Sequence, residues 1–94
     1  ILRLITNDTT TRIITGFDIT VFPLAFRDGV EFWIHNVGVS GVNGIITIAH
    51  ENAGSTAANR ILTGNNANFN LSLNSMGRVW QDAITGRWRA GYFG

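Results

Sequence analysis

Val30-Glu31-Phe32-Trp33-Ile34-His35 is the stretch of sequence that decides the fold class. Every second residue of the stretch, beginning with Val30, is apolar, and the residues between them include an acid and a histidine. Successive side chains of a strand point to opposite faces, so this period of two predicts a strand with one face against an apolar core. Residues 67–73 repeat the pattern, with Phe69, Leu71 and Leu73 alternating with polar residues.

The segments around these two stretches are short and end at turn signals. Strand-like segments are predicted at Ile1–Ile5, Arg12–Thr15, Phe17–Phe22, Ile45–His50, Arg60–Thr63, Arg78–Gln81 and Arg87–Phe93. Gly16 is expected at a bulge or bend, Pro23 ends a strand, and Asp28-Gly29 suits a tight hairpin. No uninterrupted stretch of ten residues has the spacing of an amphipathic helix.

These patterns predict one all-β domain over residues 1–94. A chain of 94 residues is too short for a second domain. Turn signals that recur about every 8 to 12 residues are typical of sandwiches and small barrels. We therefore expect a small antiparallel β-sandwich or jelly-roll-like domain.

The composition narrows the possible partners. Charged residues make up 14% of the chain, and all seven basic residues are Arg, balanced by six acids to a net charge of +1. This bias is too weak for the phosphate attraction on which nucleic-acid binders depend, so no nucleic acid is expected. Without an apolar run of about 18 residues, no membrane insertion is expected either.

Catalytic and metal-binding residues are sparse. The chain has no Cys, and neither His35 nor His50 has a second ligand at strand or helix spacing, so no metal and no cofactor are expected. A hydrolase built on Asp18, Glu31 or His50 is the enzymatic alternative. Because no nucleophile, base and orienting group can be named together, we expect no enzyme.

The last seventeen residues interleave cations with aromatic rings. Three roles are open for the rings: core or subunit-interface anchors, platforms for sugars, or platforms for the bases of a single strand. Burial is favoured, because so small a chain needs its large aromatic residues for packing. The residues predicted at a subunit or capsid interface are Trp80, Arg87, Trp88, Arg89, Tyr92 and Phe93.

Several motifs follow one another in a recognisable order. They are Arg12–Thr20, Val30–Gly38 with its Phe-Trp-Ile-His-Asn-Val-Gly phrase, Ile45–Ile48, Gly77–Trp80 and Arg87–Arg89. This order resembles the β-rich modules of tailed-bacteriophage fibres, tail proteins and head decoration proteins. The resemblance implies a β-sandwich-like subunit, commonly of a homotrimer, that acts as a non-enzymatic part of the virion.

The function expected from this resemblance is structural. The chain would associate with itself and dock on other virion proteins such as the major capsid protein, as a capsid decoration protein or fibre module. Low charge suits surfaces that are pressed against protein, because buried charges are costly. Ring-forming association would also cover strand edges that this sequence, lacking Lys, guards poorly.

The alternative function is a glycan- or receptor-binding tip domain of a tail fibre. Its ligand would be a host surface glycan, held by an exposed aromatic ring and by Asn65, Asn66, Asn68 and Asn70.

Overall fold

The stretch that predicted a strand forms the centre of one sheet. In the computed structural model, which describes residues 2–5, 10–38 and 44–92, Glu31–Asn36 is strand β3. Ile34 is fully buried and Phe32 packs against the core, while Glu31 on the opposite face is exposed. The alternation therefore predicted both the strand and its buried face correctly.

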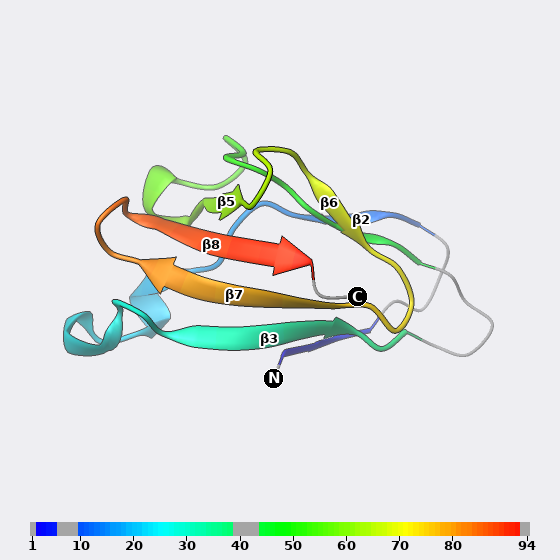
Figure 1. The fold of residues 1–94 in the computed structure, drawn as a ribbon, viewed down its shortest axis with the longest axis horizontal. Helices are drawn as coiled ribbons and strands as arrows, with labels where there is room; N and C mark the ends of the chain where they lie inside the picture. Colours follow the sequence, from blue (N-terminus) through cyan, green and yellow to red (C-terminus); the bar gives the residue numbers. More distant parts are fainter. Residues whose placement is uncertain (1, 6–9, 39–43, 93–94) are drawn as a thin grey trace.

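The described residues form eight strands and three short 3-10 helices, so the expected strand-rich fold is confirmed. The strands are β1 (Leu2–Leu4), β2 (Arg12–Ile14), β3 (Glu31–Asn36), β4 (Ile46–Ile48), β5 (Ile61–Thr63), β6 (Phe69–Leu71), β7 (Met76–Asp82) and β8 (Arg87–Tyr92). The 3-10 helices are η1 (Ile19–Val21), η2 (Leu24–Phe26) and η3 (Ala57–Asn59). One sheet has the order β1-β3-β7-β8-β5, and the other has the order β2-β4-β6 (Figure 1).

The expectation of antiparallel sheets was wrong, because both sheets are mixed. Among the described residues, β1 with β3, β2 with β4 and β5 with β8 pair in parallel. The antiparallel pairs are β3 with β7, β4 with β6 and β7 with β8. Each parallel pair joins strands that are separated by other elements, and such long connections allow the chain to return in the same direction.

Residues of both sheets build one core. Its largest members with no exposed surface are Trp88, Ile34, Ile48, Ile61, Leu71, Val79 and Asn36. The buried Asn36 of β3 donates from Nδ2 to the carbonyl oxygens of Gly44 and Leu71, at 2.9 and 3.0 Å. Since Leu71 belongs to β6, this side chain connects the two sheets inside the core.

The strand predicted at Phe17–Phe22 is instead the 3-10 helix η1. Asp18 precedes it, and its carboxylate accepts hydrogen bonds from the backbone N–H and the hydroxyl of Thr20, at 2.9 and 2.6 Å. This local capping competes with an extended chain. Asp28-Gly29 is a turn, with Gly29 at a φ of 77°, but it joins η2 to β3 and therefore closes no hairpin.

Close backbone contacts fix the loop that precedes β5. Gly16 forms an isolated bridge with Arg60, and a Cβ on Gly16 would lie 2.1 Å from the carbonyl oxygen of Asn59. The edge of β5 is also covered: Glu51 donates its N–H to the carbonyl of Ile61 at 2.7 Å, and His50 Nδ1 accepts from the N–H of Thr63 at 3.1 Å.

In the part of the chain that is described, no helix has the length and apolar character needed to cross a bilayer.

Candidate functional site

The exposed face of the five-stranded sheet presents one row of aromatic and charged residues. Trp80 of β7 stands directly opposite Glu31 of β3 on one side and Arg89 of β8 on the other. Leu62 of β5 is in turn opposite Arg89. The four residues thus lie side by side across four strands, with Trp80 36% exposed.

Two ion pairs flank Trp80. Arg78 pairs with Glu31 across β7 and β3. On the other side, Arg89 donates from Nε and Nη2 to Oδ2 of Asp82, at 3.3 and 3.2 Å. Desolvation acts to raise the pKa of Asp82, but hydrogen bonds from Thr85, from the N–H of Ile84 and from Arg89 lower it below its ordinary value. Asp82 therefore remains charged and holds Arg89 in place.

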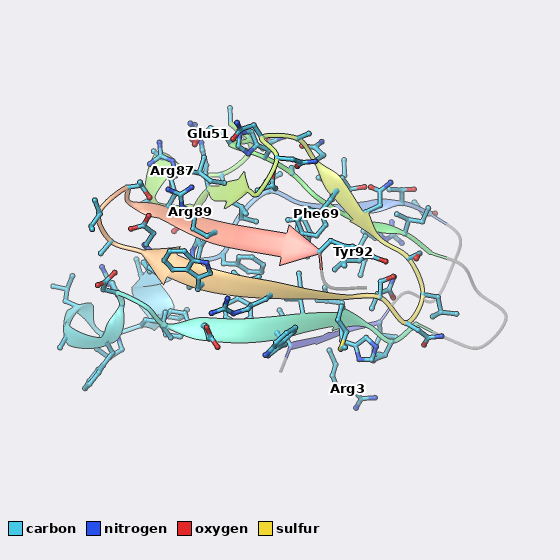
Figure 2. The ribbon with its side chains drawn as sticks, in the orientation of Figure 1. Arg3, Glu51, Phe69, Arg87, Arg89 and Tyr92 are labelled. Carbon is cyan, nitrogen blue, oxygen red and sulfur yellow. The ribbon has the colours of Figure 1, made fainter. Side chains whose placement is uncertain are left out.

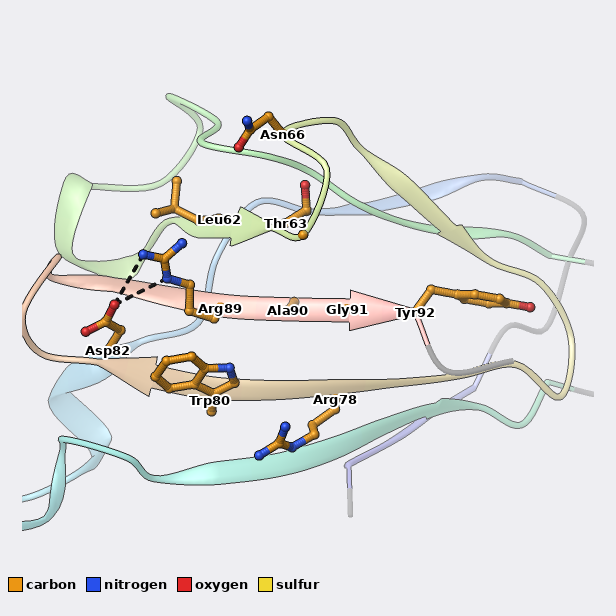
Figure 3. A pocket seen from close by; sticks show the side chains of 11 residues that line it. Leu62, Thr63, Asn66, Arg78, Trp80, Asp82, Arg89, Ala90, Gly91 and Tyr92 are labelled. Carbon is orange, nitrogen blue, oxygen red and sulfur yellow. Dashed lines mark hydrogen bonds and ion pairs between the residues drawn. The ribbon is translucent and has the colours of Figure 1, made fainter.

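A groove of about 620 Å³ lies beside these residues on β7, β8 and β5 (Figure 3). Trp80, Arg78, Asp82 and Arg89 line it from β7 and β8. The remaining lining residues are Leu62, Thr63, Gly64 and Asn66 from β5 and the turn that follows, and Ala90, Gly91 and Tyr92 from β8. We call this the outer-face groove.

A second ion-pair group lies at the start of β8. Arg87 Nε contacts both carboxylate oxygens of Glu51, at 2.9 and 3.0 Å, and Arg60 approaches the same carboxylate at 3.4 Å. The hydrogen bond from Arg87 lowers the pKa of Glu51 most, against desolvation, with a further lowering from Arg60. Figure 2 shows Glu51 and Arg87 together at one edge of the sheet. This group attaches the loop at residue 51 to β8.

The interface role predicted for Trp88 must be corrected. Trp88 has no exposed surface, and its ring meets Phe17, Phe22 and Phe32 edge to face at 5.6 to 5.8 Å between centroids. Its indole N–H donates to the carbonyl of Phe17 at 2.9 Å. Trp88 is therefore a core residue and offers no surface to another chain.

The other residues predicted at an interface have different environments. Trp80, Arg89 and Tyr92 reach the surface, and Tyr92 is 55% exposed with its ring edge-on to Phe69 at 6.5 Å (Figure 2). Arg87 is engaged with Glu51. Phe93 lies outside the described residues.

The four asparagines predicted to bind glycan do not form one surface group. Asn68 Oδ1 accepts from the N–H of His50 at 2.8 Å, and Asn70 Oδ1 accepts from the hydroxyl of Thr47 at 2.8 Å. Asn65 is exposed in the turn after β5, where Asn66 has a φ of 58°. Of the four, Asn66 lines the outer-face groove.

The three residues named for a hydrolase have separate structural contacts. Asp18 and Glu31 line the same apolar pocket of about 410 Å³, but Asp18 caps η1 and Glu31 pairs with Arg78. The hydrogen bonds from Thr20 lower the pKa of Asp18, whereas a general acid requires a raised pKa. His50 contacts Thr63. Within residues 2–5, 10–38 and 44–92, no three His, Asp or Glu side chains gather as a metal site would require.

Sequence reasoning missed the residues that make the groove open. Gly64 and Gly91 are not among the predicted site residues. The available signal was the position of Gly91, which takes an outward place in the alternation of β8 two residues after Arg89. Nothing in the sequence indicated that Gly91 would lie beside β5, because β5 and β8 are distant along the chain.

The described residues thus form a strand-rich fold of two mixed sheets, with an aromatic and charged groove on the outer face of the five-stranded sheet. No protein-family model, no curated protein and no solved structure matches the chain.

Proposed function

We propose that the chain is a non-enzymatic structural component of a virion, a capsid decoration protein or fibre module. It works by associating with copies of itself and by docking on other particle proteins, such as the major capsid protein. The observation that carries the proposal is a group of exposed apolar side chains at one end of the molecule, which we call the apolar tip. Its members are Val21, Leu24, Phe26 and Ile84, which are 68%, 81%, 71% and 95% exposed.

The apolar tip is held by the fold. η1 and η2 carry three of its residues, and the β7–β8 turn carries Ile84, at the same end of the molecule (Figure 1). The two segments are joined where the N–H of Ala83 donates to Asp28 Oδ1 at 3.1 Å. Exposed apolar side chains gathered at one end of a molecule favour a contact with another protein. Burial of each such side chain stabilises a complex by roughly 1.5–3 kcal/mol before the cost of association.

Exposed apolar residues away from the apolar tip support a ring of subunits. Ile5 beyond β1 and Ile13 in β2 are 66% and 63% exposed, and β2 lies away from the apolar tip (Figure 1). In a closed ring, one surface of each chain contacts a different surface of the next chain. Exposed apolar side chains at two separate places on one chain therefore suit a closed ring, and the subunit number of three comes from the resemblance to phage modules.

The sandwich or jelly-roll arrangement is part of the same proposal. Support comes from the shared core, to which the first sheet contributes Ile34 and Val79 and the second contributes Ile48 and Leu71. Inner faces that meet across one apolar layer are typical of sandwiches. Such a subunit leaves its tips for contacts with neighbours.

The experiment is a measurement of mass in solution by light scattering. We expect a species of three times the 10.3 kDa chain mass, and we expect Leu24→Asp and Phe26→Asp to reduce it to the single chain. Asn65→Asp adds the same charge at an exposed turn and serves as the matched control. A single chain at all concentrations, or a trimer that both tip variants leave intact, would contradict self-association through the apolar tip.

The virion location needs its own test. We expect the chain among the proteins that mass spectrometry detects in purified, nuclease-treated phage particles from the source culture. Particles that lack the chain would reject the location while leaving self-association to the first experiment.

A further inference from the structure

Gly91 of β8 and Gly64 in the turn after β5 occupy positions where neither the backbone conformation nor a close contact requires glycine. Gly64 and Gly91 both line the outer-face groove, and neither has a positive φ. A Cβ added to either residue would meet nothing within 4 Å. Gly16 and Gly77 differ, since added Cβ atoms there would meet Asn59 at 2.1 Å and Gly91 at 3.1 Å. A glycine inside a strand weakens it, and such a glycine often marks a place where a ligand approaches the backbone.

The open space above these two glycines lies beside the flat face of an aromatic ring. Figure 3 shows the indole of Trp80 lying over β7 with its broad face turned outward, beside Arg89 and Arg78. Its flanking residues are tied into the ion pairs with Asp82 and Glu31, so the space around the ring is bounded by fixed groups. An exposed aromatic face held in this way is a platform for an apolar ring face.

Hydrogen-bonding groups surround the platform. An Arg side chain has five N–H donors, and Arg89 and Arg78 each direct two nitrogens to a carboxylate, which leaves further donors toward the groove. Asn66 adds an amide, which both donates and accepts, at the opposite wall. Because each guanidinium already has a carboxylate partner, the groove suits a neutral polar ligand better than a free anion.

We infer that the outer-face groove binds a carbohydrate, with a pyranose ring stacked on Trp80 and its hydroxyls bonded to Arg89 and Arg78. A pyranose combines an apolar C–H face with a rim of hydroxyl groups that donate and accept. The groove offers the matching arrangement: a flat ring below and planar polar groups at the sides. Its volume of about 620 Å³ falls within the usual range of small-ligand sites, roughly 300–1,000 Å³.

The placement of the apolar residues disfavours a protein chain as the occupant. Acids are depleted at protein interfaces, although Trp, Tyr and Arg are enriched there, and Asp82 lines this groove. The exposed apolar residues of the apolar tip and of the β1 and β2 region lie outside the groove. The carbohydrate site is thus separate from the surfaces proposed for self-association.

The test uses the full chain, fluorescently labelled, on a printed array of neutral and sialylated oligosaccharides. Three variants are compared with the parent chain: Trp80→Ala removes the platform, Gly91→Val fills the open space, and Trp33→Phe is the control on the same sheet outside the groove. Far-ultraviolet circular dichroism and thermal unfolding establish that each variant is folded. We expect selective binding to neutral oligosaccharides, at least a tenfold loss with Trp80→Ala and with Gly91→Val, and less than a twofold change with Trp33→Phe.

Other outcomes would overturn the inference. These are an array without any bound oligosaccharide, binding that both groove variants retain, or binding to sialylated probes alone. A change in the mass of the assembly with Gly91→Val would instead identify the groove as a protein contact and would also reject it. Leu24→Asp is expected to leave binding per chain unchanged, so loss of the assembly and loss of the carbohydrate site are distinguishable.

Discussion

Trp80 and Trp88 lie on neighbouring strands of the same sheet, and they have opposite environments. Trp88 faces inward, has no exposed surface and meets three phenylalanine rings, whereas Trp80 faces outward between two ion pairs. Trp88 lies between Arg87 and Arg89 in the sequence, and Trp80 follows Arg78 by two residues. The difference shows that residue type and charge pattern do not determine burial; the parity of a position in its strand does.

The same contrast holds for other residue types. Asn36 is buried and connects the sheets, while Asn70 is exposed on β6. Gly16 is crowded by backbone, while Gly91 faces open space. Replacing each member of a pair in turn, and comparing the stabilities of the two variants, shows how much more the buried position contributes than the exposed one.

The largest difference is expected between the two tryptophans. Trp88→Ala should lower the free energy of unfolding by about 3–5 kcal/mol, because it leaves a cavity among aromatic rings. Trp80→Ala should lower it by less than about 1 kcal/mol, as for most surface substitutions. Urea unfolding followed by circular dichroism measures both. Equal losses would mean that the two faces of the sheet are packed alike.

The two glycines should differ next. Gly16→Ala should destabilise the chain by about 2–3 kcal/mol, since the new methyl group forces the backbone at Asn59 to move. Gly91→Ala should be neutral or stabilising by up to about 1 kcal/mol, because alanine loses less conformational freedom on folding. Melting temperatures of the two variants decide the point, and a destabilised Gly91→Ala chain would show that this glycine is required by the fold.

The two asparagines test the polar bridge inside the core. Asn36→Ala should cost about 2 kcal/mol, because the carbonyls of Gly44 and Leu71 would be left buried without their donor. Asn70→Ala should cost less than about 1 kcal/mol, since water replaces the contact with Thr47. Chemical unfolding of both variants compares the sites; an unaffected Asn36→Ala chain would rule out the bridge as a stabilising contact.

The smallest effect is expected from the ion pairs, and it depends on pH. The folded-state pKa of Glu51 is lowered, so its contribution to stability is complete above the unfolded value of about 4.5 and is lost as pH falls through the folded value. The gap in unfolding free energy between the parent chain and Glu51→Gln should therefore shrink on acidification. Unfolding curves recorded from pH 7 to pH 2 would reveal it.

The exposed pair provides the control for this series. Arg78 and Glu31 have side chains that are 50% and 45% exposed, against 25% and 33% for Arg87 and Glu51. Glu31→Gln should change the unfolding free energy at neutral pH by no more than about 0.5 kcal/mol. A larger change for Glu31→Gln than for Glu51→Gln would reverse the order that burial predicts.

Part of the fold and little of the candidate site followed from pattern alone. The strand around Phe32 and Ile34, the half-buried strand ending at Leu71, and the last two strands were predictable from alternation. The segment around Asp18 was not, because Phe17–Phe22 has apolar residues at strand spacing while side-chain capping by Asp18 turns it into a 3-10 helix. The groove was not predictable either, because its walls come from strands far apart in the chain.

The order of amino acids alone established a strand-rich chain with low charge, short segments and one apolar face for each strand. These properties depend on neighbours in the sequence, whose side chains alternate whatever the strand pairs with. Folding in three dimensions decided which strands run in parallel, which tryptophan is buried and where Gly91 meets the turn after β5. Those outcomes depend on contacts between segments that are distant in the chain. Alternation defines the two faces of a strand, but it does not determine which strand pairs with it.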